Sequence, residues 1–300
     1  MAAIDLNRAT TGVYLTPEQS GEIWTDTLKQ SAVTQLATKV ALPGRGAAYD
    51  TLTDAGAATW VGETGEIAVD RPHIGNKIMK PFKLAKIIPV SNEFVRDKSA
   101  LWNTIKTRAS QAIAQGIDET FLTGVIGLPS QSNVDSLSDA KTVSIGKGGY
   151  KDFANIATTV LENDGDFNGV ALSPHGLSKF LQATDANGRP LLVPMPDSTT
   201  LGSFFGGRVV KSPWGHVAAV AADSGSGRTA KPEIFGVAGD WTQAIYGTVE
   251  GIKMKVSDQA TINDHGTAIN LWQRDMIGFL IEAEIGFVVK DKTKFVTITA

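Results

Sequence analysis

The chain has 300 residues, a formal net charge of −3 and 20% charged residues. This balance argues against a protein whose main task is to neutralise phosphates, because such proteins normally carry a basic domain. The absence of cysteine excludes disulfides, thiolate metal sites and a cysteine nucleophile, and no segment approaches the roughly 18 apolar residues of a membrane span, so we expect a soluble, unsecreted chain.

The first residues predict an N-terminal arm followed by a helix. Residues 1–15 are small and polar with little periodicity, which is typical of a segment without a core of its own. Thr16, Pro17 and Gln19 then supply a cap, a first-turn proline and a capping-box partner for a helix. We assign residues 1–34 to this arm and helix.

Residues 57–90 predict an extended hairpin, with two strands around a long tip that is rich in glycine and charge. Opposite charges across a hairpin contribute only about 0.2–1 kcal/mol per pair, and an isolated two-stranded hairpin is marginal in water. The hairpin therefore needs a surface to lie on, which is either the body of its own subunit or another subunit. The two arms carry opposite charges, with Glu63, Glu66 and Asp70 on the first and Lys77, Lys80, Lys83 and Lys86 on the second.

A strand and a long helix follow at once. Ser91 can cap the helix, Glu93 suits its first turn, and an apolar stripe continues through Phe121 to an expected end near Gly124. A helix of about thirty residues spans roughly 48 Å, which exceeds a small compact core, so other elements must lie along it. The strand before it alternates, with one face formed by Phe82, Leu84, Ile88 and Val90.

The middle and the end of the chain predict two different kinds of structure. Residues 146–231 contain an amphipathic helix, a short buried strand and a second helix capped by Ser173 and Pro174, which together indicate a compact α/β unit. From Pro232 onward the pattern is rich in strands. The longest of these has the single apolar face expected of an antiparallel strand packed on one side, formed by Phe279, Ile281, Ala283, Ile285 and Phe287.

Little in the sequence indicates catalysis or a resident metal. The segment DGDFNG (164–169) matches the opening of a calcium loop, but its twelfth position is His175 rather than a bidentate glutamate, so a turn before a strand is favoured. We find no phosphate loop and no nucleophile elbow, and we predict neither a cofactor nor an enzymatic activity. The histidines are scattered, no pair has metal-ligand spacing on a helix, and we interpret each as structural or superficial: His73, His175, His216 and His265.

Several segments, taken together and in order, resemble the major capsid proteins of tailed bacteriophages. The likeness covers nearly the whole chain from about residue 35, and it depends on the ordered set rather than on any single motif. The segments are ATWVGE (58–63), PFKLAKIIPVSNEFVRD (81–97), NGVALSPHGLSKFLQATDANGRPLL (168–192), AGDWTQAIYG (238–247) and IEAEIGFVV (281–289).

The resemblance implies an α+β fold of the tailed-phage capsid type, with an N-terminal arm in front of it. A peripheral domain, which combines a long spine helix with an antiparallel sheet, is assigned to residues 35–56, 91–145 and 232–300. The extended hairpin loop is assigned to residues 57–90, and the axial α/β domain is assigned to residues 146–231.

The resemblance also implies a structural function. In that family the chain assembles with its own copies, as hexamers and pentamers, into an icosahedral shell around double-stranded DNA, which it contacts without sequence specificity. Separate scaffold, portal, protease and decoration proteins are the other expected partners, no membrane is involved, and the protein reaches the virion after assembly in the host bacterial cytoplasm. The loop lies on the neighbouring subunit, so the expected intersubunit contacts are Glu63, Glu66, Asp70, Arg71, Lys77 and Lys80.

Two departures and three alternatives accompany this interpretation. The chain lacks the long N-terminal scaffolding segment of some relatives, so we expect a separate scaffold or none. Some relatives crosslink a loop lysine to an asparagine of the next subunit, for which Lys77 or Lys80 with Asn263 or Asn270 are candidates. The alternatives are an encapsulin-like shell, which encloses enzymes instead of DNA, a calcium-dependent or carboxylate enzyme, and a tail or decoration protein.

Overall fold

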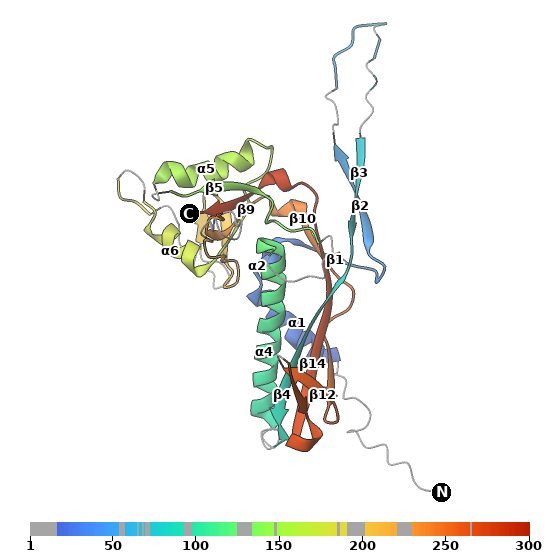
Figure 1. The fold of residues 1–300 in the computed structure, drawn as a ribbon. Coiled ribbons are helices and arrows are strands. Elements are labelled where there is room, and N and C mark those ends of the chain that lie inside the picture. Colours follow the sequence, from blue (N-terminus) through green and yellow to red (C-terminus); the bar gives the residue numbers. More distant parts are fainter. Residues whose placement is uncertain are drawn as a thin grey trace.

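The computed structural model describes residues 17–53, 58–64, 66, 67, 69, 73–92, 98–124, 134–146, 149–184, 187–190, 202–220, 230–264 and 266–300. These residues form an elongated body, a lobe beside one end of it, and a ribbon that projects beyond both (Figure 1). The body contains a long helix against one sheet, and the lobe contains a second sheet with its own helices. None of the helices in the described part of the chain combines the length and the apolar character that a membrane span requires.

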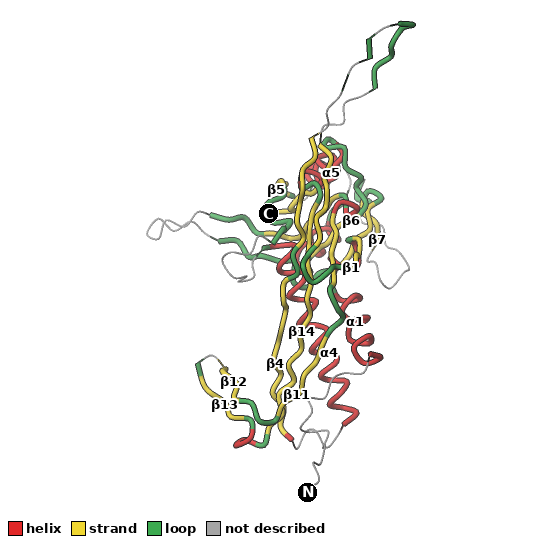
Figure 2. Tube along the Cα trace, turned by 90° about the vertical axis from the view of Figure 1, so that its right-hand side faces the viewer, coloured by secondary structure: helices red, strands yellow, loops and turns green. Residues whose placement is uncertain are grey.

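The sheet of the body is built around its longest strand, β14 (Met276–Val289). Its other strands are β1 (Thr38–Ala41), β4 (Phe82–Ser91), β10 (Ala244–Thr248) and β11 (Lys253–Ser257). β4, β10 and β11 pair antiparallel with β14, and β1 extends the sheet by parallel pairing with β10. Figure 2 shows β14 between β4 and β11 along the body. The apolar face predicted for β14 is confirmed, because alternate residues from Phe279 to Phe287 are buried.

The long helix α4 (Lys98–Asp118) lies along this sheet (Figure 1). It continues into a π-helical turn, η1 (Glu119–Thr123), and ends at Gly124, as predicted. Gly124 has a φ of 65°, a left-handed conformation that glycine adopts without strain. Within the core that the helix shares with β14, Phe121 stacks on Phe287 with ring centroids 4.2 Å apart.

The close approach of α4 to β4 depends on a glycine. A Cβ at Gly116 would overlap the Leu84 side chain, so a larger residue there would force either that side chain or the helix to move. The alternation predicted for β4 is confirmed, because the residues of its predicted inner face are half-buried: Phe82, Leu84, Ile88 and Val90.

Two shorter helices precede the body sheet, namely α1 (Pro17–Gln30) and α2 (Ala32–Leu36). α1 lies against α4, and Asp26 on α1 forms an ion pair with Lys106 on α4 at 3.4 Å. The helix predicted from Pro17 is therefore confirmed, and its packing joins the start of the chain to the long helix.

A buried carboxylate connects three separate segments at the end of α4. Asp118 accepts hydrogen bonds from the hydroxyls of Ser31 and Ser212, each at 2.6 Å, and from the backbone N–H groups of Ala32 at 3.0 Å and Val33 at 3.2 Å. The two backbone groups open α2, so the carboxylate also caps that helix. Burial raises the pKa of Asp118 above its ordinary value of 3.8, although these hydrogen bonds act in the opposite direction.

The sheet of the lobe contains β5 (Lys141–Ser144), β6 (Gly169–Leu172), β7 (Gly202–Phe204), β8 (Gly207–Lys211), β9 (Ile234–Gly239) and β15 (Phe295–Thr299). Their order across the sheet is β5-β15-β9-β6-β8-β7. Helices α5 (Tyr150–Leu161) and α6 (Pro174–Gln182) pack on it. Both helices and β6 confirm the predicted helix, strand, helix order, and the Ser173 hydroxyl caps α6 by accepting a hydrogen bond from Gly176 N at 3.1 Å.

This sheet crosses the domain boundaries expected from the sequence. β5, β9 and β15 lie outside residues 146–231, yet β15 pairs with β5 and β9, and β9 pairs with β6. The difference arises because long-range strand pairing leaves no mark on local composition or periodicity. The lobe therefore takes strands from segments that the sequence assigned to the peripheral domain, and the domain boundaries themselves stay a prediction.

The projecting ribbon consists of β2 (Ala47–Thr53) and β3 (His73–Met79), which pair antiparallel. Its first strand lies before residue 57, where the sequence placed the start of the hairpin. The return arm is also divided, because β4 pairs with β14 and not with the ribbon. Pro81 lies between β3 and β4 and has no backbone N–H for a ladder, which explains why the chain changes partners there.

A smaller hairpin, formed by β12 (Thr261–Asp264) and β13 (Thr267–Asn270), lies at the end of the body opposite the ribbon (Figure 2). Three short 3₁₀ turns complete the described elements: η2 (Trp241–Gln243), η3 (Trp272–Arg274) and η4 (Lys292–Lys294). The body thus carries a hairpin at each end, and the ribbon is the longer of the two.

Candidate functional site at the base of the ribbon

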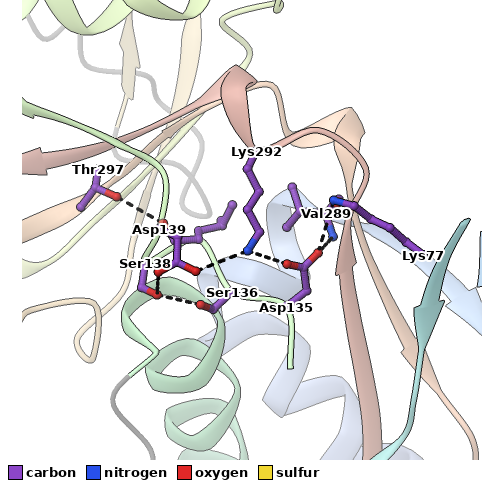
Figure 3. A network of polar contacts seen from close by, with 9 residues as sticks. Lys77, Asp135, Ser136, Ser138, Asp139, Val289, Lys292 and Thr297 are labelled. Carbon is purple, nitrogen blue, oxygen red and sulfur yellow. Dashed lines mark hydrogen bonds and ion pairs between the residues drawn. The ribbon is translucent and has the colours of Figure 1, made fainter. Parts of the chain in front are cut away.

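One carboxylate connects the base of the ribbon to the rest of the subunit. Asp135 Oδ2 accepts a hydrogen bond from Val289 N at 2.8 Å and lies 3.9 Å from Lys77 Nζ. Lys77, on β3, also donates a hydrogen bond from Nζ to Val289 O at 2.7 Å. Asp135 Oδ1 lies 2.6 Å from Lys292 Nζ, so the carboxylate is held between two lysines (Figure 3). We call these four residues the anchor.

The anchor continues into the lobe. Lys292 Nζ lies 3.6 Å from Asp139 Oδ2, and Thr297 Oγ1 on β15 donates a hydrogen bond to Leu137 O at 3.3 Å. Residues 134–140 therefore lie between the ribbon on one side and the lobe sheet on the other (Figure 3). A force on the ribbon would reach both sheets through this segment.

Apolar packing also fixes the base of the ribbon. Met79, the last residue of β3, is fully buried in a cluster with Leu42, Ile245 and Val288. Gly286 on β14 makes this packing possible, because a Cβ there would lie only 2.8 Å from Met79 Cγ and from Leu42 Cδ2. The base of the ribbon is therefore held both by polar contacts and by a small core of its own.

Beyond the anchor, the ribbon leads to a tip whose apolar side chains are exposed in the isolated subunit. Trp60 is 104% exposed, and Val61, Ile67 and Val69 are exposed as well. A tryptophan buries roughly 150–250 Å² when it is covered, so this tip carries a large unburied apolar area. Several exposed apolar side chains, with a tryptophan among them, on one projecting tip are typical of an interaction site.

The structure distributes the predicted contact residues over the ribbon. Glu63 and Glu66 lie at the exposed tip, and Lys80 is exposed just beyond β3. Lys77 lies at the anchor with 37% of its side chain exposed, and it contacts its own chain. Whether these residues contact a neighbouring subunit stays a prediction. The two other predicted residues, Asp70 and Arg71, lie outside the described residues.

One lysine of β4 pairs with a carboxylate on β14 instead of one on the first arm of the hairpin. Lys83 forms an ion pair with Glu282 on β14, and Lys255 Nζ on β11 lies 2.9 Å from the same carboxyl group. The hydrogen bond from Lys83, followed by that from Lys255, lowers the pKa of Glu282 below its ordinary value of 4.5. These contacts follow from the register of β4 on β14, which the charges alone did not indicate.

Asp135 and Trp60 define this site, but neither was among the residues predicted from the sequence. Asp135 and Val289 are separated by 154 positions, and no local pattern around Asp135 distinguishes it from an ordinary surface carboxylate. Trp60 did carry a signal, because a tryptophan in a tip rich in glycine and charge has no core of its own to enter. That signal could have added Trp60 to the predicted contact residues.

The turn predicted at DGDFNG is observed between α5 and β6. Its Asn168 side chain donates a hydrogen bond to Asp240 Oδ1 at 2.9 Å and accepts one from Trp241 N, also at 2.9 Å. Trp241 Nε1 donates to Gly169 O at 3.0 Å, so the turn fastens the start of η2 to the start of β6. This gives Asn168 a structural role in the lobe.

Three potential metal ligands also meet in the lobe, namely His175, His216 and Glu233. From the sequence we interpreted each histidine as structural or superficial, and the structure shows that the rings of His175 and His216 stack with centroids 4.3 Å apart. Metal-ligand spacing along one helix could not reveal this cluster, because its three residues come from three separate segments. The cluster is therefore a finding of the structure.

The family model described as the phage capsid family matches residues 11–300. This chain belongs to the phage capsid family. Relatives of this capsid protein include a probable major capsid protein of Mycobacterium phage D29, 27% identical over 295 residues that cover 95% of this chain and 90% of the relative. A probable major capsid protein of Mycobacterium phage L5 is 28% identical over 303 residues, covering 95% and 89%. The capsid protein is thus a structural protein of a phage shell.

Solved structures share the fold of this capsid protein. A chain from Mycobacterium phage Cain matches with a TM-score of 0.68 at 21% identity, covering 90% of both chains. A chain from Gordonia phage Cozz gives 0.65 at 23% identity, covering 90% of this chain and 86% of that one. The capsid of an empty GTA particle gives 0.60 at 14% identity, covering 90% and 89%. The tailed-phage capsid fold expected from the sequence is confirmed.

Proposed function

We propose that this capsid protein assembles with its own copies, as hexamers and pentamers, into an icosahedral shell that encloses phage double-stranded DNA. The observation that carries the proposal is the tip of the ribbon, where Trp60 is fully exposed in the isolated subunit. A large apolar side chain held away from its own core is typical of a surface that a partner covers. The partner that we favour is a second copy of this chain, because the subunits of each hexamer or pentamer repeat the same contact with their neighbours.

The anchor supports the same proposal. A loop that docks on a neighbour binds more tightly when its base is fixed in advance, because less conformational freedom is lost on binding. Lys77 and Met79 fix the base through Asp135 and the small apolar core, while the tip stays exposed. We therefore assign Lys77 a positioning role within its subunit, and we assign the contacts with the neighbour to Trp60 and to the other charged residues: Glu63, Glu66, Asp70, Arg71 and Lys80.

The proposed shell confines DNA without binding it tightly. A net charge of −3 does not supply the broad basic surface of proteins that neutralise many phosphates. Scaffold, portal, protease and decoration functions would belong to separate chains, and assembly would take place in the host bacterial cytoplasm. The family match and the capsid relatives favour a phage shell over an encapsulin-like shell, and they favour a structural role over an enzyme.

A shortened ribbon tests the proposal. Thr53 and His73 face each other at the end of the β2–β3 ladder, so residues 54–72 can be replaced by Asn-Gly, a two-residue turn that suits antiparallel strands. This variant keeps Lys77, Met79 and the whole anchor. We expect unchanged melting by circular dichroism, together with a loss of about tenfold or more in particle yield by sedimentation, since tenfold corresponds to only ~1.4 kcal/mol.

Two substitutions of Trp60 are compared, and the conservative one is the matched control. Trp60→Ala removes the indole and should lower particle yield, whereas Trp60→Phe keeps an aromatic ring and should retain most of it. Normal yield from both Trp60→Ala and the shortened ribbon would contradict the proposal. Failure of the shortened chain to fold would instead assign the tip to the core of its own subunit. Nuclease-protected DNA in particles from lysed cells, rather than protein cargo, would separate a phage shell from an encapsulin-like shell.

A further inference from the structure

His175, His216 and Glu233 form a compact cluster in the lobe, far from the ribbon and its anchor. One potential ligand atom from each residue lies within 4.8 Å of the others. The two imidazole rings stack with their planes 13° apart, and His216 Nε2 lies 2.8 Å from Glu233 Oε1. His175 is exposed and the other two residues are half-buried, so an ion from solution can reach the cluster.

The backbone holds His175 in place without any ligand. His175 lies in the first turn of α6, which begins at Pro174 and is capped by Ser173. Gly176 allows this turn to lie directly on β9, because a Cβ at Gly176 would be 2.7 Å from Phe235 O. The first turn of α6 is therefore fixed against the strand that follows Glu233.

The other two residues are held by a short bridge between their segments. His216 and Glu233 immediately precede Val217 and Ile234, which exchange two hydrogen bonds: Val217 N donates to Ile234 O at 3.2 Å, and Ile234 N donates to Val217 O at 2.9 Å. Ala300 N also donates to Glu233 O at 3.0 Å. All three side chains thus project from segments that the fold has already brought together.

The side chains have the chemistry of a transition-metal site. Zinc lies about 2.0–2.2 Å from imidazole nitrogen and carboxylate oxygen, so neighbouring ligand atoms in a tetrahedral site are roughly 3.4 Å apart. The cluster spans up to 4.8 Å, and rotation of the exposed His175 ring would close the difference. Two imidazoles with one carboxylate suit Zn²⁺, Co²⁺ or Ni²⁺ and leave a position for water. They do not suit Ca²⁺ or Mg²⁺, which take oxygen ligands.

The second histidine separates this cluster from an ordinary surface pair. A hydrogen bond between one histidine and one glutamate, such as that of His216 with Glu233, is common on protein surfaces. The ring of His175 adds a second imidazole beside this pair, with the two ring centroids 4.3 Å apart, so one ion can take a nitrogen from each ring and an oxygen from Glu233.

We propose that His175, His216 and Glu233 bind one divalent transition-metal ion, with Zn²⁺ the best fit. The ion would tie the first turn of α6 to the segments that follow β8 and precede β9. Because the three ligands come together only in the folded chain, the ion would stabilise the lobe by mass action. This inference does not depend on the proposed shell function, so the failure of either leaves the other standing.

The test uses the full chain after removal of metals with EDTA and dialysis. Co²⁺ is added first, because its visible d–d bands report the coordination of the ion, and Zn²⁺ is then titrated by calorimetry. We expect one ion per chain. His175→Ala, His216→Ala and Glu233→Gln should each weaken Zn²⁺ binding about 100-fold or more, since losing a direct ligand should exceed the roughly 10–100-fold cost of losing a residue that only supports one.

A fourth substitution provides the control. His73→Ala removes one imidazole from β3 and should bind Zn²⁺ as the unaltered chain does. Saturating Zn²⁺ should also raise the melting temperature of the unaltered chain and of His73→Ala, and should leave that of the three ligand variants unchanged. Binding that persists in both His175→Ala and Glu233→Gln would overturn the proposal, and so would a stoichiometry far below one ion per chain.

Discussion

Replacing Asp118 by asparagine should destabilise the subunit strongly, although the two side chains have the same shape. Asp118 Oδ1 accepts hydrogen bonds from Ser31 Oγ and Val33 N, and Oδ2 accepts from Ala32 N and Ser212 Oγ. A hydroxyl can rotate to accept instead of donate, but a backbone N–H cannot. Whichever oxygen becomes the amide NH₂ group therefore faces a backbone N–H, and one buried donor at the start of α2 loses its partner.

The expected loss in the free energy of unfolding is about 2–4 kcal/mol. An unpaired buried donor costs about 1–3 kcal/mol, and the hydrogen bonds that remain lose roughly 1 kcal/mol because their acceptor is no longer charged. A neutral amide is easier to bury than a carboxylate, and this offsets part of the loss, because burial also raises the pKa of Asp118. A change of this size is a large share of the roughly 5–15 kcal/mol that stabilises a typical domain.

Urea unfolding of unassembled chains at pH 7, followed by circular dichroism, measures this loss. Ser212→Ala is the matched control, because it removes one hydroxyl donor and leaves both backbone donors paired, and it should cost about 1 kcal/mol. An Asp118→Asn variant within about 0.5 kcal/mol of the unaltered chain, which is the range of neutral surface substitutions, would refute the reasoning. It would show that the carboxylate is not the acceptor on which the start of α2 depends.

The pH dependence of this variant has a defined sign. Because burial raises the folded-state pKa of Asp118, the folded chain keeps this proton at pH values where the unfolded chain has lost it. The contribution of Asp118 to stability is therefore complete below pH 3.8 and is lost as the pH rises through the folded-state value. Asp118→Asn lacks this titration, so its deficit should widen as the pH falls toward 4. A deficit that narrows on acidification would contradict the assigned direction.

Three further substitutions examine the body and the anchor. Gly116→Val should cost about 1–3 kcal/mol in urea unfolding by overlapping Leu84, and an unchanged midpoint would contradict the close packing of α4 on β4. Because its hydrogen bond with Lys83 lowers the pKa of Glu282, this carboxylate contributes stability above pH 4.5 that is lost as the pH falls through the lower folded-state value. Glu282→Gln should therefore flatten the fall in melting temperature below pH 4.5, and identical acid profiles would disprove the pairing. Asp135→Asn should speed hydrogen exchange in β3 and leave exchange in α5 unchanged, and equal protection of β3 in both proteins would exclude the anchor.

The elements that could be predicted from the sequence are those with signals inside or beside them. Ser173 and Pro174 mark the start of α6, Gly124 marks the end of the long helix, and the alternation from Phe279 to Phe287 identifies the inner face of β14. Each signal acts over a few residues, because caps and periodic apolar faces are properties of one element. The fold class was predicted in a different way, from the resemblance of several ordered segments to the capsid proteins of tailed phages.

The parts that could not be predicted depend on which distant segments meet. An apolar pattern identifies the face of a strand but not its partner, so the pairing of β2 with β3 and of β15 with β9 could not be predicted. The same limit applies to polar contacts. Asp118, Asp135 and the cluster at His175 each take partners from remote segments, and nothing in their own surroundings distinguishes them from surface residues.

The position of β14 and β15 constrains how the subunit can be made. β14 joins three strands of the body sheet, β15 lies inside the lobe sheet, and both come from residues 276–299. A nascent chain that has been translated only to residue 275 lacks the middle of both sheets. Neither sheet can therefore form in the usual order, which starts at the N-terminus during synthesis. A prematurely terminated chain would remain unfolded and accessible to proteases. Truncated copies would then be degraded before they could enter a shell.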